Sequence, residues 1–139
     1  MARRALPVAV SVLVLAGCGG GDRLSHDEYQ RLLTQRGNAL NETVRAEQDE
    51  PARIEARLNR LADELERTRP PADAQGAHDE FTRALRAYAL TMSDFLLEFR
   101  TARTNRRRGE ALTRLSRSPA ARELQRARAS LARAGYELP

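Results

Sequence analysis

Lysine and tryptophan are absent from this chain, and cysteine occurs once, at Cys18. A single cysteine excludes an internal disulfide framework and a cluster of thiolate metal ligands. All 24 basic residues are therefore arginine, and the many alanine, leucine and glutamate residues favour long helices. The formal net charge is +5, with charges of both signs interleaved along the sequence. This mild excess does not indicate nucleic-acid binding, so we expect no nucleic-acid partner.

The first residues are arranged like a targeting segment. Arg3 and Arg4 come near the start, and an apolar run from Ala5 to Leu15 follows them. As a helix, this run would span roughly 16 Å at about 1.5 Å per residue. That length is too short for a hydrocarbon core of about 30 Å. We therefore interpret residues 1–17 as a secretory signal peptide that is cleaved.

The apolar run ends in Leu15-Ala16-Gly17-Cys18, which resembles the lipobox of bacterial lipoproteins. The resemblance covers residues 1–18, with the basic start, the apolar run and the cysteine in the order typical of that class. It implies that the Cys18 thiol receives a diacylglyceryl group and that a dedicated peptidase cleaves after Gly17. Two or more acyl chains would make the membrane anchor effectively permanent. The alternative is an ordinary secretory signal that leaves Cys18 as a free thiol.

A glycine-rich segment follows the cysteine and predicts a flexible tether over residues 18–23. The expected location is the extracytoplasmic face of the cell membrane, and the partner expected first is the membrane itself, through the lipid anchor. The remaining part, residues 24–139, is similar in composition to small helical lipoproteins of high-GC bacteria. That similarity implies no site residues.

Residues 24–139 predict an all-α fold, an antiparallel helical bundle of about four helices. Ser25 and Glu28 have the spacing of a capping box, and the helix that they begin is expected to reach about Glu50. Pro51 suits the first turn of a second helix, and Pro70-Pro71 ends it. The second helix has apolar residues three or four positions apart, at Ile54, Leu58, Leu61 and Leu65.

The third predicted helix begins between Ala72 and Ala77 and has the most regular apolar stripe in the chain. Arg106–Gly109 is expected to close this helix or to interrupt the next segment, because cations stabilise a helix C-terminus. The alternative is a contact with anionic lipid or an envelope polymer. A short helical segment with Leu112 and Leu115 is expected next, and Ser118-Pro119 predicts a last helix that ends near Ala134. The stripe consists of Phe81, Leu85, Tyr88, Met92, Phe95, Phe99 and Ala102.

Leu90 and Leu97 lie on the opposite side of the third helix from this stripe, at 100° per residue. One interpretation is a central helix that other helices contact from both sides. A second is a seam for a partner protein or for self-association. A third is that both are isolated surface leucines.

Two predicted helix starts share a short pattern, because His26-Asp27-Glu28-Tyr29 recurs as His78-Asp79-Glu80-Phe81. Duplication of a helical hairpin would produce this pattern. Convergence would also produce it, because acidic residues stabilise the first turn of a helix. The two histidines would bind a metal only if the two helix starts met in space. We predict solvated histidines and no metal site.

Motifs that commit a chain to a reaction are missing from this sequence. It has no nucleophile elbow, no glycine-rich phosphate loop, no H-E-x-x-H and no paired cysteines. We therefore expect no catalytic residues and no cofactor, and we predict a lipid-anchored module that binds a protein or an envelope component. The alternative is a module for a small molecule or ion, with a cavity between helices lined by Tyr88, Met92 and Phe95.

Overall fold

The computed structural model describes residues 23–47 and 50–139. The predicted signal peptide, the lipobox with Cys18 and the tether up to Asp22 lie outside these described residues. The described part has no strand, and none of its helices is both long and apolar enough to cross a bilayer. Its elements are α1 (His26–Ala46), α2 (Pro51–Glu66), the short 3-10 helix η1 (Ala72–Ala74), α3 (Gln75–Thr101), α4 (Asn105–Ser116) and α5 (Pro119–Arg133).

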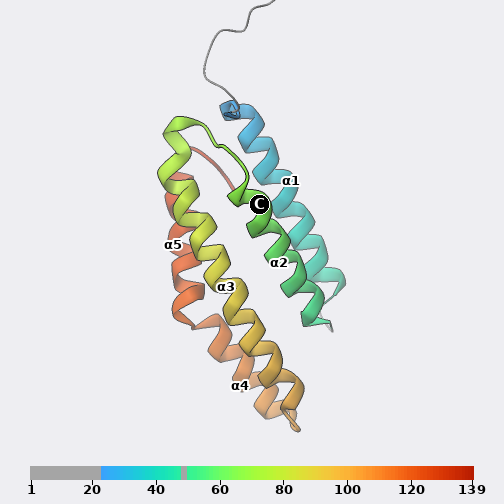
Figure 1. The fold of residues 1–139 in the computed structure, drawn as a ribbon. Coiled ribbons are helices and arrows are strands. Elements are labelled where there is room, and N and C mark those ends of the chain that lie inside the picture. Colours follow the sequence, from blue (N-terminus) through green and yellow to red (C-terminus); the bar gives the residue numbers. More distant parts are fainter. Residues whose placement is uncertain (1–22, 48–49) are drawn as a thin grey trace, which may run out of the picture.

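The helices form a bundle with four arms, and α4 and α5 together make the fourth arm (Figure 1). The chain runs along α1, returns in α2, reverses into α3 and comes back through α4 and α5. Helix α3 packs against α2, α4 and α5, whereas α1 packs mainly against α2. The all-α bundle predicted from the sequence is confirmed, with a break in the fourth arm.

Helix α1 begins at the predicted capping box. The Ser25 hydroxyl accepts a hydrogen bond from the Glu28 amide at 3.3 Å, and the Glu28 carboxylate accepts one from the Ser25 amide at 2.8 Å. The bond from this amide lowers the pKa of Glu28. The predicted end near Glu50 is wrong, because α1 stops at Ala46. No large apolar side chain lies between Val44 and α2 to bury another turn of helix.

Helices α2 and α3 lie within the predicted limits. Pro51 is the first residue of α2, and the helix ends at Glu66, before the fully buried Pro70. After η1, helix α3 begins at Gln75, inside the predicted interval. The apolar stripe of α3 is buried or half-buried along its whole length, as its spacing predicted.

The turn between α3 and α4 differs from the prediction. Helix α3 ends at Thr101, and the Thr104 hydroxyl begins α4 by accepting a hydrogen bond from the Arg107 amide at 3.3 Å. Residues 106–109 therefore form the first turns of α4 and do not close α3. The favourable effect of cations at a helix C-terminus is small, and the hydroxyl cap determines where the helix begins.

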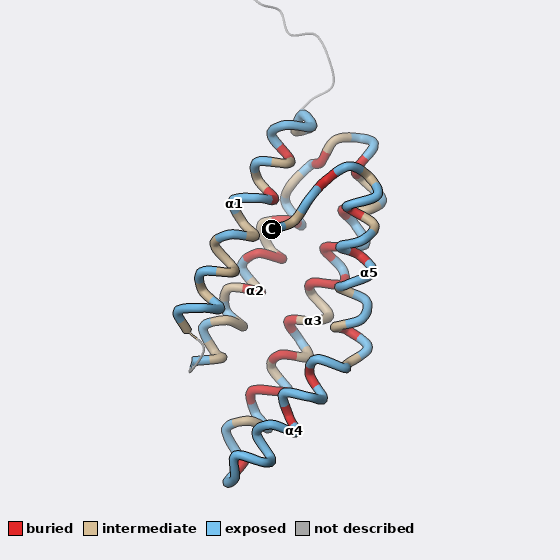
Figure 2. The backbone as a smooth tube through the Cα atoms, turned by 180° about the vertical axis from the view of Figure 1, so that it is seen from behind, coloured by how far each residue is buried: buried red, intermediate tan, exposed pale blue. Residues whose placement is uncertain are grey.

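Helix α5 begins with the predicted Ser118 cap and ends before Gly135, which has a φ of +89°. Glycine favours this left-handed conformation because it has no Cβ. The Tyr136 amide donates to the Leu131 carbonyl oxygen at 3.0 Å and completes a Schellman turn. This turn directs the C-terminal tail, residues 135–139, back across the bundle toward α1 (Figure 2).

The hydrophobic core follows α3 and extends to the helices around it, as the buried positions in Figure 2 show. The fully buried leucines come from each arm, with Leu33 on α1, Leu65 on α2, Leu85 on α3 and Leu131 on α5. All the core residues of the described chain lie between Leu24 and Leu138. These residues form a hydrophobic core of their own, so we expect residues 23–139 to fold without the preceding segment.

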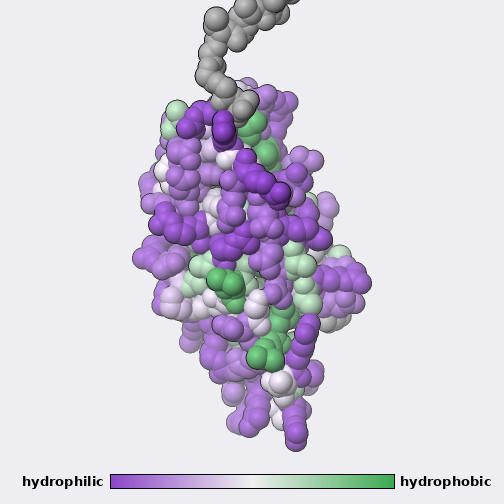
Figure 3. Space-filling model, in the orientation of Figure 1, coloured by the Kyte–Doolittle hydropathy of each residue, from purple (hydrophilic) through white to green (hydrophobic). Residues whose placement is uncertain are grey.

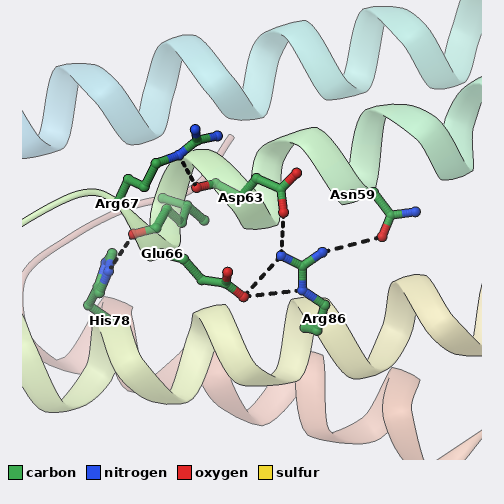
Figure 4. A network of polar contacts seen from close by, with 7 residues as sticks. Asn59, Asp63, Glu66, Arg67, His78 and Arg86 are labelled. Atoms are coloured by element: carbon green, nitrogen blue, oxygen red, sulfur yellow. Dashed lines mark hydrogen bonds and ion pairs between the residues drawn. The ribbon is translucent and has the colours of Figure 1, made fainter.

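A polar network joins the surfaces of α2 and α3 (Figure 4). Arg86 of α3 donates to Asp63 at 2.5 Å and to Glu66 at 3.0 Å, and both acceptors are on α2. Ser93 of α3 donates to Glu55 of α2 about two turns further along. These groups are partly exposed, so each contact contributes at most about 1 kcal/mol. The network fixes how α2 and α3 are oriented more than it stabilises the fold.

Arg23 belongs to the folded domain and not to the predicted tether. Its guanidinium donates to the Pro70 carbonyl oxygen at 2.9 Å and to Gln75 Oε1 at 2.7 Å. The neighbouring Leu24 amide donates to the Arg69 carbonyl oxygen at 2.9 Å. The folded domain therefore includes residue 23, which the prediction placed in the tether.

Candidate functional site

An apolar pocket lies between the α1–α2 pair and the α3–α5 pair. Its volume is about 270 Å³, close to the lower limit of the roughly 300–1,000 Å³ that is typical of small-molecule sites. Four helices contribute apolar side chains to its lining. These are Leu33, Leu40 and Val44 of α1, Ile54, Leu58, Leu61 and Leu65 of α2, Phe81, Leu85, Tyr88 and Met92 of α3, and Leu124 of α5.

The pocket opens toward the turn between α1 and α2. Along α1 the lining changes from the buried Leu33 to Val44, which is 40% exposed. Along α2 it changes in the same direction, from the buried Leu65 to the half-buried Ile54. Helix α4 packs on α3 and makes no extensive contact with α1 or α2. The break in the fourth arm therefore leaves this end of the α1–α2 pair without a covering helix.

The cavity expected between the helices has two of its three predicted lining residues. Tyr88 and Met92 line the pocket, and burial raises the pKa of the Tyr88 phenol. The expected lining by Phe95 is wrong, because this residue lies on the α4 side of α3, with its ring centre 5.4 Å from that of Phe99. The stripe of α3 is continuous in sequence, but its first half faces α1 and α2 and its second half faces α4.

One edge of the pocket is cationic. Arg36 and Asn41 of α1 and Arg128 of α5 are among the lining residues. Arg36 forms an ion pair with Glu64 of α2 at 2.9 Å. Arg128 donates to the Pro139 carbonyl oxygen through a long contact of 3.4 Å. No aspartate or glutamate lines the pocket among the residues that the structure describes.

The C-terminal tail lies beside this cationic edge. The Gln30 side chain exchanges two hydrogen bonds with the Glu137 backbone, both at 2.9 Å. Leu138 and Pro139 then line the pocket, and Pro139 lies over Gly37 of α1. A Cβ on Gly37 would be only 2.6 Å from Pro139 Cγ. The glycine that interrupts the apolar stripe of α1 therefore marks the place where the tail approaches the helix.

The Gly37→Ala substitution is expected to displace the end of the tail without destabilising the domain. Alanine raises the stability of a helix interior by roughly 0.5–1 kcal/mol over glycine, but its Cβ excludes Pro139. Hydrogen exchange should show a faster Glu137 amide, while chemical denaturation shows no loss of stability. Gly109→Ala in α4 is the matched control, because no atom lies within 4 Å of a Cβ at that position. An unchanged Glu137 amide in Gly37→Ala would contradict the prediction.

A buried polar pair lies where α1, α2 and α3 meet. Tyr29 Oη is 2.8 Å from His78 Nδ1, and His78 Nε2 is 3.1 Å from the Leu65 carbonyl oxygen. A carbonyl oxygen only accepts, so Nε2 carries the proton and the Tyr29 hydroxyl donates to Nδ1. Burial lowers the pKa of His78 and raises the pKa of Tyr29. The prediction of a solvated histidine is wrong for His78, which is only 3% exposed.

The two histidines differ in their places in the fold. His26 is the first residue of α1, whereas His78 lies one turn into α3. This difference in register favours convergence over duplication of a hairpin. Within residues 23–47 and 50–139, no group of three or more histidine, cysteine or acidic side chains is placed to hold a metal.

Leu90 and Leu97 are exposed on the outer face of α3, by 64% and 68%. The interpretation that neighbouring helices contact α3 at these leucines is therefore wrong. Figure 3 shows separate apolar patches over the second half of α3, within a largely hydrophilic face. A partner seam and isolated surface leucines are the two interpretations that remain.

Comparison of the chain with models of protein families, with curated proteins and with solved structures finds no match. Cys18 lies outside the described residues, so its assignment depends on the lipobox resemblance.

Proposed function

We propose that this protein is a lipid-anchored, extracytoplasmic lipoprotein whose helical domain binds a small apolar molecule between the α1–α2 and α3–α5 pairs. The observation that carries this proposal is the apolar pocket of about 270 Å³. Protein interiors are normally close-packed, with few voids larger than a water molecule. Apolar side chains that face an open hollow contact water at a free-energy cost, which an apolar occupant would remove.

The lipobox resemblance supports the anchor and limits how far the domain moves from the membrane. Because Arg23 is bonded to the domain, only residues 18–22 are left for the tether. Extended residues span about 3.3–3.6 Å each, so this tether reaches less than about 20 Å. The pocket is then held near the bilayer surface, where apolar molecules partition.

The binding proposal is tested with a dye and the isolated helical domain, residues 22–139. N-phenyl-1-naphthylamine is neutral and becomes fluorescent in apolar surroundings, so its titration reports occupancy of the pocket. We expect one dye per domain. Val44→Trp fills the pocket opening and is expected to weaken binding roughly tenfold, which corresponds to about 1.4 kcal/mol.

The matched control is Leu112→Trp, which introduces the same side chain at another exposed apolar position. Leu112 lies on α4, is 51% exposed and does not line the pocket. The native chain has no tryptophan, so in each variant the fluorescence of the single introduced tryptophan reports how far that side chain is buried. Equal dye affinity in the native domain and in Val44→Trp would contradict the proposal.

A second candidate function is supported by the exposed leucines of α3. Leu90 and Leu97 are seven residues apart, which places them on one face and roughly 10 Å apart along the axis. This exposed pair would suit a protein or envelope partner, or a second copy of the chain. Single exposed leucines are common, so the pair supports a partner less strongly than the pocket supports a ligand.

The double variant Leu90→Asp, Leu97→Asp is expected to remove crosslinked partners in intact cells and to leave the domain folded. Both side chains are mostly exposed, so the change should alter stability by less than about 0.5 kcal/mol. Leu112→Asp is the control for a charge introduced at an exposed leucine elsewhere. Crosslinks that persist in the double variant would show that Leu90 and Leu97 do not form a partner-binding surface.

A further inference from the structure

The fourth arm carries most of the positive charge of the domain. Residues 105–133, which form α4 and α5, contain nine arginines and two acidic residues. Residues 26–66, which include α1 and α2, contain six arginines and ten acidic residues. Helices α1 and α5 lie on opposite sides of the bundle, with α2 and α3 between them (Figures 1 and 2). One side of the bundle is therefore strongly cationic, whereas the opposite side is not.

All nine arginines of this arm are exposed, and few of their charges are neutralised. Arg114 forms an ion pair with Glu98 of α3. Arg106 and Arg126 form long ion pairs, at 3.7 Å and 3.9 Å, with glutamates of their own helices. In the part of the chain that the structure describes, these arginines of the arm have no acidic side chain as a partner: Arg107, Arg108, Arg117, Arg122 and Arg133. The folded domain therefore leaves most of this charge available to a partner.

The positions of these arginines do not help the helices to form. Residues 106–108 are three consecutive arginines in the first turns of α4, and its first turn has no acidic residue. The helix dipole favours anions at this end and disfavours cations. On α5, Arg122, Arg126 and Arg133 share one stripe, because spacings of four and seven residues return to the same face of a helix. Such departures from the local rules of helix formation are expected where a surface has a function.

The charge extends along the whole arm and suits an extended anionic surface. From residue 106 to residue 133, the arm spans up to roughly 40 Å at about 1.5 Å per residue. A tether that reaches less than about 20 Å would keep the domain beside the bilayer that holds the proposed lipid anchor. A bilayer with anionic headgroups attracts basic segments, and each arginine near its surface strengthens binding roughly fivefold.

We propose that the arginine side of α4 and α5 docks the domain on a bilayer surface that carries anionic phosphate headgroups. The choice of a bilayer as the anionic partner rests on the proposed lipid anchor. Docking through the arm places the long axis of the bundle along the membrane, with α1 on the side that faces away from it. The anchor and the arm together then fix the orientation of the domain.

Vesicle flotation of the helical domain, residues 22–139, tests the docking surface without the anchor. The vesicles contain phosphatidylcholine alone or an equal mixture of phosphatidylcholine and phosphatidylglycerol. We expect binding to the mixed vesicles only, and loss of that binding as salt is added, because ions screen exposed charges. The absence of binding to mixed vesicles would overturn the proposal. Because this domain lacks Cys18, a failure to dock is distinct from a loss of the anchor or of dye binding.

Two triple variants then locate the contact. The arm variant replaces exposed arginines without an acidic partner: Arg107→Gln, Arg117→Gln and Arg133→Gln. The control variant replaces exposed arginines of α1 and α2: Arg31→Gln, Arg45→Gln and Arg60→Gln. Circular dichroism checks that both stay folded. We expect the arm variant to bind mixed vesicles at least about tenfold more weakly, and the control variant to change far less. Equal losses would mean that the overall charge attracts the vesicles, and this would overturn the proposal.

A tryptophan on the arm distinguishes a bilayer from a soluble anionic polymer. Ala129→Trp places the indole on the exposed side of α5, between Arg126 and Arg133. We expect its emission to shift to shorter wavelength on mixed vesicles and to stay unchanged with polyphosphate. Gln35→Trp, on the exposed side of α1, is the matched control and should shift with neither. Polyphosphate that binds more tightly than the vesicles, with no shift of Ala129→Trp on vesicles, would identify a polymer as the partner and overturn the proposal.

Discussion

Cys18→Ser is expected to release the protein from the membrane completely. In a lipoprotein, the cysteine thiol carries the diacylglyceryl group, and a serine hydroxyl does not take its place. Each buried methylene contributes about 0.8 kcal/mol to membrane binding, so two long chains contribute on the order of 20 kcal/mol. No described helix is long and apolar enough to compensate by crossing the bilayer. Membrane fractionation should find the native chain in the pellet and the variant in the supernatant.

Gly20→Ala, in the predicted tether, controls for changes near the cleavage site and should remain in the pellet. Mass spectrometry of the mature N-terminus gives an independent measurement. The native chain should begin at Cys18 and carry the mass of its acyl chains. A mature chain with an unmodified Cys18 thiol would contradict the lipoprotein assignment, whereas the dye experiment on the domain would still test the pocket.

The second large effect is an acid-induced loss of stability that depends on His78. An unfolded histidine has a pKa of about 6.5, and burial lowers the pKa of His78 in the folded domain. Below pH 6.5 the unfolded chain therefore binds a proton that the folded domain does not bind. The free energy of unfolding is therefore highest above pH 6.5, and it falls as the pH approaches the lowered pKa of His78 in the folded domain. The free energy of unfolding should fall by up to about 1.4 kcal/mol per pH unit in that window.

The chain has only two histidines, which provides a matched pair of variants. Urea denaturation between pH 7.5 and 5.5 should show a loss of stability in the native domain and in His26→Gln. The slope should disappear in His78→Gln. At pH 7.5, Tyr29→Phe is expected to cost about 1–3 kcal/mol, because it leaves the buried Nδ1 of His78 without a donor. A slope that persists in His78→Gln would assign the effect to other groups.

Helix starts could be predicted from the sequence wherever a local side chain determines them. Ser25 and Ser118 cap α1 and α5 at the predicted positions, and Pro51 begins α2. The start of α4 was missed, although Thr104 is also a cap residue. The charges of Arg106–Gly109 favour a helix end, but the preference of cations for helix C-termini is weaker than the effect of the Thr104 cap.

The candidate site could be predicted only in part. Tyr88 and Met92 line the pocket as their spacing on α3 indicated, whereas Phe95 faces α4 because the fourth arm changes direction. Arg128 and Pro139 were missed because their roles depend on contacts with residues far away in the sequence. Periodicity identifies which face of a helix is apolar, but it does not identify which element covers that face.

The hydrogen bonds between Gln30 and Glu137 join residues 107 positions apart, and this separation has a consequence for the order of folding. A chain that is synthesised from its N-terminus has a complete α1 long before residue 137 is added. Contacts over such a separation close large loops, and folding is slow when it depends on them. Helix α1 and the tail are therefore expected to join last. Until that step, the surface of α1 around Gly37, which Pro139 covers in the folded domain, stays exposed.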